Sequence, residues 1–254
     1  MIDIHCHALP GADGPASDAE AVQLLAELAA QGVDTVAVTP YVAEDAPAEL
    51  PAQIRESVTA LRRSAAGTTI PAVIAGAEVD LGWALAAPPE ALRQATFGGM
   101  GKSLLVNVPE RDTPRDFDDL LLNLMVRGYG IVMAHPERGV SYQEAPERLG
   151  RLVAAGILVQ IDAASLLGDA PPAAARLATV LLEESSAHII ASNAGGTERR
   201  PVRLAEAVAL AEEMIGPRAR WMAREAPAAV LAGAPLRDAP EAKPTRRGLF
   251  GRRR

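Results

Sequence analysis

Two histidines near the start of the chain are the first side chains whose spacing suggests chemistry. His5 and His7 end residues 1–7, in which Ile2 and Ile4 are β-branched and apolar, so this segment is predicted to be a buried strand. Residues two apart in a strand point to the same face and lie about 7 Å apart. Two imidazoles placed in this way can bind one transition-metal ion. The turn-rich loop that follows puts them at a strand end, where α/β proteins carry their sites.

Other polar residues occupy similar positions in the chain. Glu78 lies in an expected strand at 72–79, and His135 directly follows another at 131–134. In a barrel of parallel strands these ends meet on one rim, where three imidazoles and a carboxylate would suit Zn, Mn or Fe. Arg138 could bind phosphate oxygens. Taken singly, each residue also has an ordinary structural interpretation, as a core histidine, a surface carboxylate or a solvated arginine.

The elements that must position these residues alternate between strands and helices. Strands are predicted at 1–7, 33–39, 72–79, 103–108, 131–134, 158–162 and 188–191, and helices at 17–31, 47–66, 114–127, 144–155, 171–184, 201–215 and 226–232. This alternation implies parallel strands and right-handed crossovers. Seven such units predict an α/β fold and favour a barrel, with an open sheet as the alternative. His188 starts its strand, so we expect it on the opposite rim in a structural role.

Composition limits the class of protein. The 254 residues are 49% hydrophobic, which is enough for one large α/β domain or two small ones. A net charge of −7 argues against nucleic acid as a partner. The single cysteine, Cys6, leaves no intramolecular disulfide, and no signal peptide or apolar run of spanning length is found. A cytoplasmic protein is expected.

The composition changes near the end of the chain. We predict a barrel domain at 1–233 and a disordered, proline-containing basic tail at 234–254. A solvated tail is the simpler interpretation. The alternative is weak contact with anionic lipid at the inner face of the membrane, because the tail's basic residues flank Leu249 and Phe250.

Four segments resemble the bacterial capsular-polysaccharide and exopolysaccharide protein-tyrosine phosphatases of the PHP (polymerase and histidinol phosphatase) superfamily. They are MIDIHCHALPG at 1–11, QGVDTVAVTP at 31–40, GAE at 76–78 and AHPER at 134–138, and the resemblance spans about residues 1–232. It implies a distorted seven-stranded β/α barrel and a three-metal site, usually with manganese. It also implies hydrolysis of phosphotyrosine on a partner protein, such as the bacterial tyrosine kinase that controls polysaccharide export.

The resemblance assigns roles residue by residue. The matching metal ligands are His5, His7, Asp13, Glu78 and His135, and Asn193 stands where the family has an aspartate. Arg138 matches a phosphate-binding position, and Arg199 or Arg200, before Pro201, matches a second one. We take Arg200 as the second phosphate-binding candidate. The resemblance makes His135 and Arg138 the catalytic candidates.

This chain also departs from the family pattern. Tyr41 replaces a histidine, Asn107 a glutamate, and Asn193-Ala194-Gly195 an Asp-x-His motif. Of the four carboxylates that the family places around its ions, only Asp13 and Glu78 remain. Repulsion between neighbouring dications amounts to many kcal/mol without anionic ligands between them. We therefore expect one or two ions of Mn or another divalent metal such as Zn or Fe. His5, His7 and Glu78 would hold the first with Asn193 or His135.

Three functions remain open from the sequence. The first is a metal-dependent phosphomonoester hydrolase with reduced metal content, in which Arg138 neutralises phosphoryl charge. The second is a pseudo-phosphatase that binds a phosphotyrosine tail or an export-machinery partner, which the four replaced residues favour. The third is a mononuclear metal hydrolase of another small substrate. The intact histidines, Glu78 and Arg138 favour the first.

Overall fold

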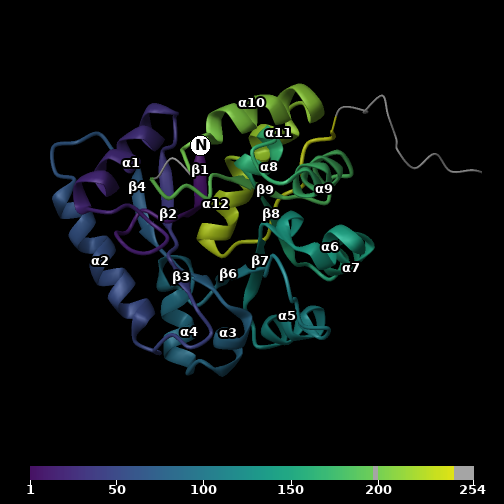
Figure 1. Ribbon diagram of the computed structural model, residues 1–254, viewed down its shortest axis with the longest axis horizontal. Coiled ribbons are helices and arrows are strands. Elements are labelled where there is room, and N and C mark those ends of the chain that lie inside the picture. The colour runs from purple at the N-terminus through teal and green to yellow at the C-terminus, as the bar shows by residue number, and fades with distance from the viewer. Residues whose placement is uncertain (197–199, 243–254) are drawn as a thin grey trace, which may run out of the picture.

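Parallel strands lie at the centre of the molecule, and helices surround them (Figure 1). The computed structural model describes residues 1–196 and 200–242, so the predictions for Arg199 and for residues 243–254 lie outside the described residues. Every strand pair in the described ranges is parallel. The predicted α/β fold with parallel strands is confirmed.

The strands form two sheets. The first has the order β1-β2-β4, with β1 (Ile2–Cys6), β2 (Thr35–Val38) and β4 (Ala72–Ala75). The second has the order β3-β5-β6-β7-β8-β9, with β3 (Tyr41–Val42), β5 (Glu78–Val79), β6 (Ser103–Asn107), β7 (Gly130–Ala134), β8 (Leu158–Asp162) and β9 (Ile189–Ala191). The strand predicted at 72–79 is therefore divided into β4 and β5. The strand predicted at 33–39 corresponds to β2, and β3 is a further short strand after Pro40.

Local sequence explains the divisions. Pro40 separates β2 from β3 and has no N–H to donate to a neighbouring strand. Gly76 separates β4 from β5, and a Cβ there would lie 3.2 Å from the Phe97 ring. Backbone bonds still connect the two segments across the break, from Gly76 N to Val38 O (3.0 Å) and from Glu78 N to Pro40 O (3.2 Å).

The first strand also meets the segment that follows the last strand. Cys6 forms an isolated parallel bridge with Ala194, and His7 N donates to Ala194 O at 2.8 Å. Asn193 N donates to His5 O at 2.9 Å. The carboxyl ends of β1 and β9 are thus held together, and this places the residues after both strands in one region.

The helices follow the predicted alternation with some differences. They are α1 (Asp18–Ala30), α2 (Leu50–Ser64), α3 (Leu81–Ala86), α4 (Pro89–Ala95), α5 (Phe117–Val126), α6 (Val140–Glu144), α7 (Glu147–Ala154), α8 (Ala163–Leu167), α9 (Pro172–Glu183), α10 (Leu204–Ile215), α11 (Arg218–Met222) and α12 (Glu225–Ala232). The helix predicted at 144–155 corresponds to α7, which begins only after Pro146. Short helices α3, α4, α6, α8 and α11 were not predicted. The Asp80 N-cap of α3, which accepts from Gly82 N at 2.7 Å, was a readable signal.

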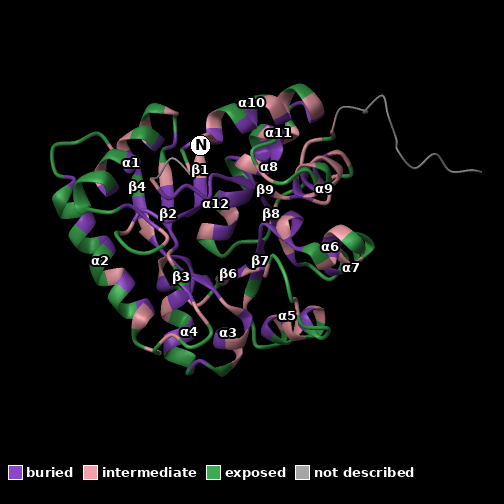
Figure 2. Cartoon of the chain, in the orientation of Figure 1, coloured by how far each residue is buried: buried purple, intermediate pink, exposed green. Residues whose placement is uncertain are grey.

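The interior is built mainly from aliphatic side chains, with buried residues concentrated on the strands (Figure 2). Thirteen of the buried residues in the described ranges are polar or charged, and His5, His7, Glu78, His135, Asp162 and Asn193 are among them. Buried charges cost free energy unless they are paired or bind an ion, so this group marks a site. In the described part of the chain, no helix is both long and apolar enough to cross a membrane.

Candidate metal centre and adjoining pocket

Three predicted ligands converge beside the carboxyl end of β1. His5 and His7 come from β1 and the residue after it, and Glu78 begins β5. Their nearest ligand atoms all lie within 4.8 Å of one another, and all three residues are buried. The Nε2 atoms of His5 and His7 are 3.1 Å apart, and Glu78 Oε2 lies 3.4 and 3.5 Å from them. Two imidazole nitrogens and one carboxylate oxygen that face each other in this way fit a divalent transition metal.

Hydrogen bonds on the far side of each ring select the tautomer that metal binding requires. His5 Nδ1 lies 2.9 Å from Gln160 Oε1, and His7 Nδ1 lies 2.6 Å from Asp13 Oδ2. Both acceptors require a proton on Nδ1, so each Nε2 lone pair is free to face the centre. Metal-binding histidines commonly have such an outer partner.

His135 lies on the other side of Glu78. Its Nε2 is 3.0 Å from Glu78 Oε1, so the two oxygens of Glu78 face different imidazoles. His135 Nδ1 is buried and has no partner among the described residues, which marks a place for an ion or water. Burial opposes protonation of His135, but the charges of Asp162 and Glu78 outweigh it and raise the pKa to about 9. Burial likewise opposes ionisation of Glu78, but His5 and His135 hold its pKa well below the usual range.

Asp13 and Tyr41 border the cluster. Asp13 is partly exposed, binds His7 and accepts from Tyr41 N at 3.2 Å, so it positions His7. Tyr41, at the position where the resemblance leads us to expect a histidine, directs its hydroxyl to Asp80 Oδ2 at 3.4 Å. Burial, helped by the charge of Asp80, raises the pKa of Tyr41 to about 12 and keeps the phenol neutral. Asn107, at the end of β6, is only partly buried and contacts the Tyr41 hydroxyl.

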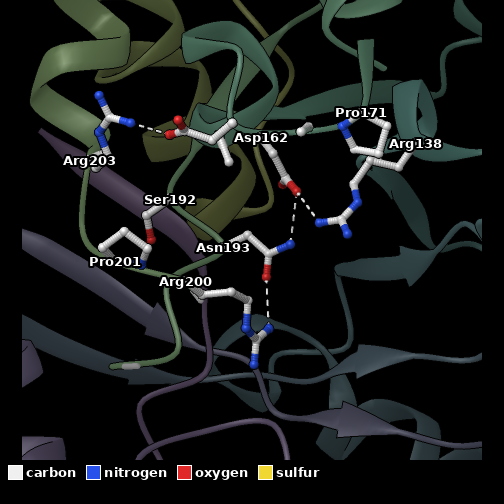
Figure 3. Close-up of a pocket in the computed structure, with 11 residues that line it drawn as sticks. Arg138, Asp162, Pro171, Ser192, Asn193, Arg200, Pro201 and Arg203 are labelled. Atoms are coloured by element: carbon white, nitrogen blue, oxygen red, sulfur yellow. Dashed lines mark hydrogen bonds and ion pairs between the residues drawn. The ribbon is translucent and has the colours of Figure 1, made fainter. Parts of the chain in front are cut away.

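Figure 3 shows the residues that line a pocket of about 630 Å³. One of them, Asn193, connects it to the cluster, because its backbone N donates to His5 O at 2.9 Å. Arg138, Arg200 and Arg203 line it, together with Asp162 and Asn193. Arg138 pairs with Glu110 and with Asp162 Oδ2, the latter at 3.3 Å. Arg200 Nη1 donates to Asn193 Oδ1 at 3.2 Å. Guanidinium groups are suited to phosphate oxygens, so the two arginines predicted to bind phosphate line the same pocket.

Asn193 lies between the pocket and the strands, outside the three-residue cluster. Its Nδ2 donates to Asp162 Oδ2 at 2.9 Å, and its Oδ1 accepts from Arg200. Its backbone is left-handed, with φ at 49°, a conformation that asparagine tolerates better than most residues. Both ends of the side-chain amide are therefore engaged in hydrogen bonds.

Three site residues were missed from the sequence: Gln160, Asp162 and Glu137. Asp162 is buried at the end of β8 and accepts from Gln160 Nε2 at 3.0 Å, and its backbone N donates to Glu137 Oε1 at 2.9 Å. Burial raises the pKa of Glu137 to about 7, helped by the charge of Asp162. The signal for Asp162 was its place at the end of a predicted strand, the criterion that identified His135.

These features define a class: a metal-dependent hydrolase on an α/β fold, with the site at the carboxyl ends of parallel strands. The sequence profile of the capsular polysaccharide synthesis family CpsB/CapC matches residues 1–232. The chain belongs to this family, which confirms the resemblance found in the sequence.

The individual relatives that match this chain are named or described as tyrosine phosphatases. The tyrosine-protein phosphatase YwqE of Bacillus subtilis (strain 168) is 30% identical over 253 residues, which are 99% of each chain. The putative tyrosine-protein phosphatase CapC of Staphylococcus aureus is 28% identical over 208 residues, 80% of each chain. Among solved structures, one from a study of YwqE from Bacillus subtilis and CpsB from Streptococcus pneumoniae, described as unique metal-dependent tyrosine phosphatases, has a TM-score of 0.79 at 28% identity. The match covers 96% of this chain and 98% of the chain in that solved structure.

A more distant match concerns the fold alone. A mutant organophosphorus hydrolase from Deinococcus radiodurans has a TM-score of 0.55 at 16% identity, covering 91% of this chain and 92% of that one. The enzyme interpretation is thus supported by family membership, and the pseudo-phosphatase alternative is not favoured.

Proposed function

We propose that this chain is a metal-dependent protein-tyrosine phosphatase of capsular or exopolysaccharide synthesis, acting on a phosphotyrosine-bearing protein such as a bacterial tyrosine kinase. The observation that carries the proposal is the His5–His7–Glu78 cluster, which hydrogen bonds through Gln160 and Asp162 connect to a pocket lined by arginines. The first element can bind a metal, and the second can bind the phosphoryl group. Phosphomonoester hydrolysis needs both in one place.

The residues that would hold the ion are those whose donor atoms face one another. His5, His7 and Glu78 form the primary set, His135 shares Glu78, and Asp13 orients His7. Asn193 lies outside this set, and its Oδ1 accepts from Arg200. The donor set suits Mn, Zn or Fe, and its few carboxylates favour one or two ions. When bound, such an ion supplies Lewis acidity toward a phosphoryl oxygen and makes a water more acidic.

The protein's own side chains would bind and orient the substrate. Arg138 and Arg200 lie on two sides of Asp162 and Asn193 and can direct N–H groups at phosphoryl oxygens (Figure 3). Arg138 is held by Glu110, which limits its rotation before substrate binds. A pre-oriented guanidinium loses less conformational freedom when it binds phosphate.

The direct test is hydrolysis of a phosphotyrosine peptide by protein loaded with Mn, Zn or Fe. We expect release of inorganic phosphate that Glu78→Gln abolishes and that Asp118→Asn retains, because Asp118 pairs with Arg148 away from the site. Hydrolysis of a small phosphomonoester without hydrolysis of the peptide would favour the small-substrate alternative. Peptide binding without phosphate release under every metal would contradict the hydrolase proposal.

We further infer a seven-unit barrel and a division of the chain at residue 233. In support of the barrel, backbone bonds connect the two sheets across their divided strands, and the Cys6–Ala194 bridge joins the first unit to the last. In support of the division, the family profile ends at residue 232.

We also propose a cytoplasmic location, with weak contact to anionic lipid through the basic tail. Vesicle sedimentation of the full chain and of residues 1–236 at low and high salt would test the contact.

A further inference from the structure

A continuous chain of hydrogen bonds connects the two arginines of the pocket. Arg138 Nη1 donates to Asp162 Oδ2 (3.3 Å), Asn193 Nδ2 donates to the same oxygen (2.9 Å), and Arg200 Nη1 donates to Asn193 Oδ1 (3.2 Å). Figure 3 shows Asp162 and Asn193 side by side between the two guanidinium groups. Both middle residues are buried, at 1% and 6% exposure.

The donors and acceptors in this series of hydrogen bonds determine which residue is the acid and which is the amide. Asp162 must accept two bonds at Oδ2, and a carboxylate has the lone pairs to do so. Asn193 must donate at one end and accept at the other, which an amide can do and an ionised carboxylate cannot. The amide can therefore take one orientation, with Nδ2 toward Asp162 and Oδ1 toward Arg200.

We propose that Asp162 and Asn193 are a matched pair of positioning residues that hold Arg138 and Arg200 as one phosphate clamp, with the site's negative charge placed at Asp162 instead of at residue 193. Asn193 is then no lost ligand, because a carboxylate there would face Asp162 with no proton to share. The inference rests on the proposed function for its ligand, a phosphoryl group. It assigns a role to Asp162 that goes beyond that function.

Further contacts support Asp162 as the centre of this arrangement. Its Oδ1 accepts from Gln160 Nε2 at 3.0 Å, and Gln160 Oε1 in turn binds Nδ1 of the metal-centre residue His5 at 2.9 Å. The backbone N of Asp162 is fixed by Glu137 Oε1 at 2.9 Å. A carboxylate with this many partners is rigid, so it can set the positions of both guanidinium groups.

A double-mutant cycle on the Mn-loaded full chain tests the proposal. Asp162→Asn removes the shared charged acceptor, and Asn193→Asp puts two buried carboxylates side by side. We expect each single change to weaken inhibition by inorganic phosphate on the order of tenfold or more, the loss associated with buried bonds to charged groups. The exchange variant Asp162→Asn/Asn193→Asp restores a donor–acceptor pair, so its loss should be clearly smaller than the product of the single losses.

Controls separate this role from general stability. The metal-free melting temperature of the same four proteins should show the same coupling, because the pair does not depend on bound metal. Asp118→Asn removes a carboxylate from another arginine pair, with Arg148, and should leave phosphate inhibition unchanged. Loss of stability without any change in phosphate inhibition or KM would make Asp162 a structural residue and overturn the proposal.

The outcomes also distinguish this inference from the proposed function. One contrary result is that the exchange variant loses phosphate inhibition by the full product of the two single losses, with no recovery. That result would overturn the matched pair even if the wild-type protein hydrolyses phosphotyrosine. A wild-type protein that binds no phosphate and hydrolyses no phosphotyrosine would overturn the proposed function. Coupling in the metal-free melting temperature would then show the pair as a structural contact alone.

Discussion

The guanidinium of Arg200 occupies the space into which a side chain at Gly195 would extend. A Cβ on Gly195 would lie 2.7 Å from Arg200 Nη2 and 2.9 Å from its Nε. The family resemblance places a histidine at residue 195, so here glycine and the position of Arg200 belong together. As a result, the positively charged guanidinium of Arg200 lies next to Asn193, where the resemblance leads us to expect the imidazole of a histidine at residue 195.

Gly195→Ala should therefore weaken phosphate binding without loss of fold or metal. The backbone at Gly195 is not left-handed, so alanine adds no strain there, but its Cβ must push Arg200 away. We expect KM for phosphotyrosine to rise roughly tenfold, equivalent to about 1.4 kcal/mol. Gly150→Ala is the matched control, because no atom lies within 4 Å of its added Cβ. Equal KM values for the two variants would show that Arg200 does not bind the phosphoryl group.

Restoring the family residues is a test of the departures from the family pattern. Tyr41→His, Asn107→Glu, Asn193→Asp and Gly195→His together add donors but also put a carboxylate next to Asp162 and displace Arg200. We expect this quadruple variant to gain metal only when Asp162→Asn is added to it. Elemental analysis of both variants, after circular dichroism has shown that they fold, gives the comparison. More metal in the quadruple variant than in the quintuple one would contradict the expectation.

Gln160 should control metal affinity from outside the cluster. Its Oε1 fixes the proton of His5 on Nδ1, so Gln160→Leu removes the partner that selects the metal-binding tautomer. Loss of such an outer partner typically weakens metal affinity by about 10- to 100-fold. Competition with a fluorescent chelator measures the change. An unchanged dissociation constant would mean that His5 needs no help from Gln160.

Stability should fall at mildly acidic pH because of His188. Its Nδ1 accepts from Val159 N at 3.1 Å, and burial, reinforced by the charge of Arg218, lowers its pKa from 6.5 to about 4. Below about pH 6.5 the unfolded chain binds a proton that the folded chain refuses, so the free energy of unfolding decreases as pH falls toward 4.

His188→Asn should reduce this pH dependence, because the asparagine oxygen can accept from Val159 N without titrating. Urea unfolding at pH 7.5 and pH 5 of the wild type and the variant measures the difference. The stability lost between the two pH values should be smaller in His188→Asn. An equal loss in both proteins would assign the effect to other groups.

The sequence predicted the regular parts of the fold because hydrophobic periodicity is a local signal. It could not show that the strand predicted at 72–79 would divide or that a further strand would follow Pro40, since that depends on how Gly76 and Pro40 meet neighbouring strands. Short helices such as α3 and α8 contain too few residues for a period to be recognised.

The site was predictable where a metal-binding type of residue lies at or near the end of a predicted strand, as at His5, His7, Glu78 and His135. Asp162 met the same criterion and was overlooked. Gln160 could not be identified, because an amide within an apolar strand becomes significant only through its contacts with His5 and Asp162. The relation between Gly195 and Arg200 likewise depends on the three-dimensional course of the chain.

The metal content of the purified chain tests the central claim most directly. The cluster of His5, His7 and Glu78, with His135 on the second oxygen of Glu78, predicts one or two transition-metal ions per chain after loading with manganese and removal of free metal. His5→Ala should lose them, and His188→Asn, a histidine change away from the cluster, should keep them. Three ions per chain, or the same metal content in His5→Ala as in the wild type, would contradict the account.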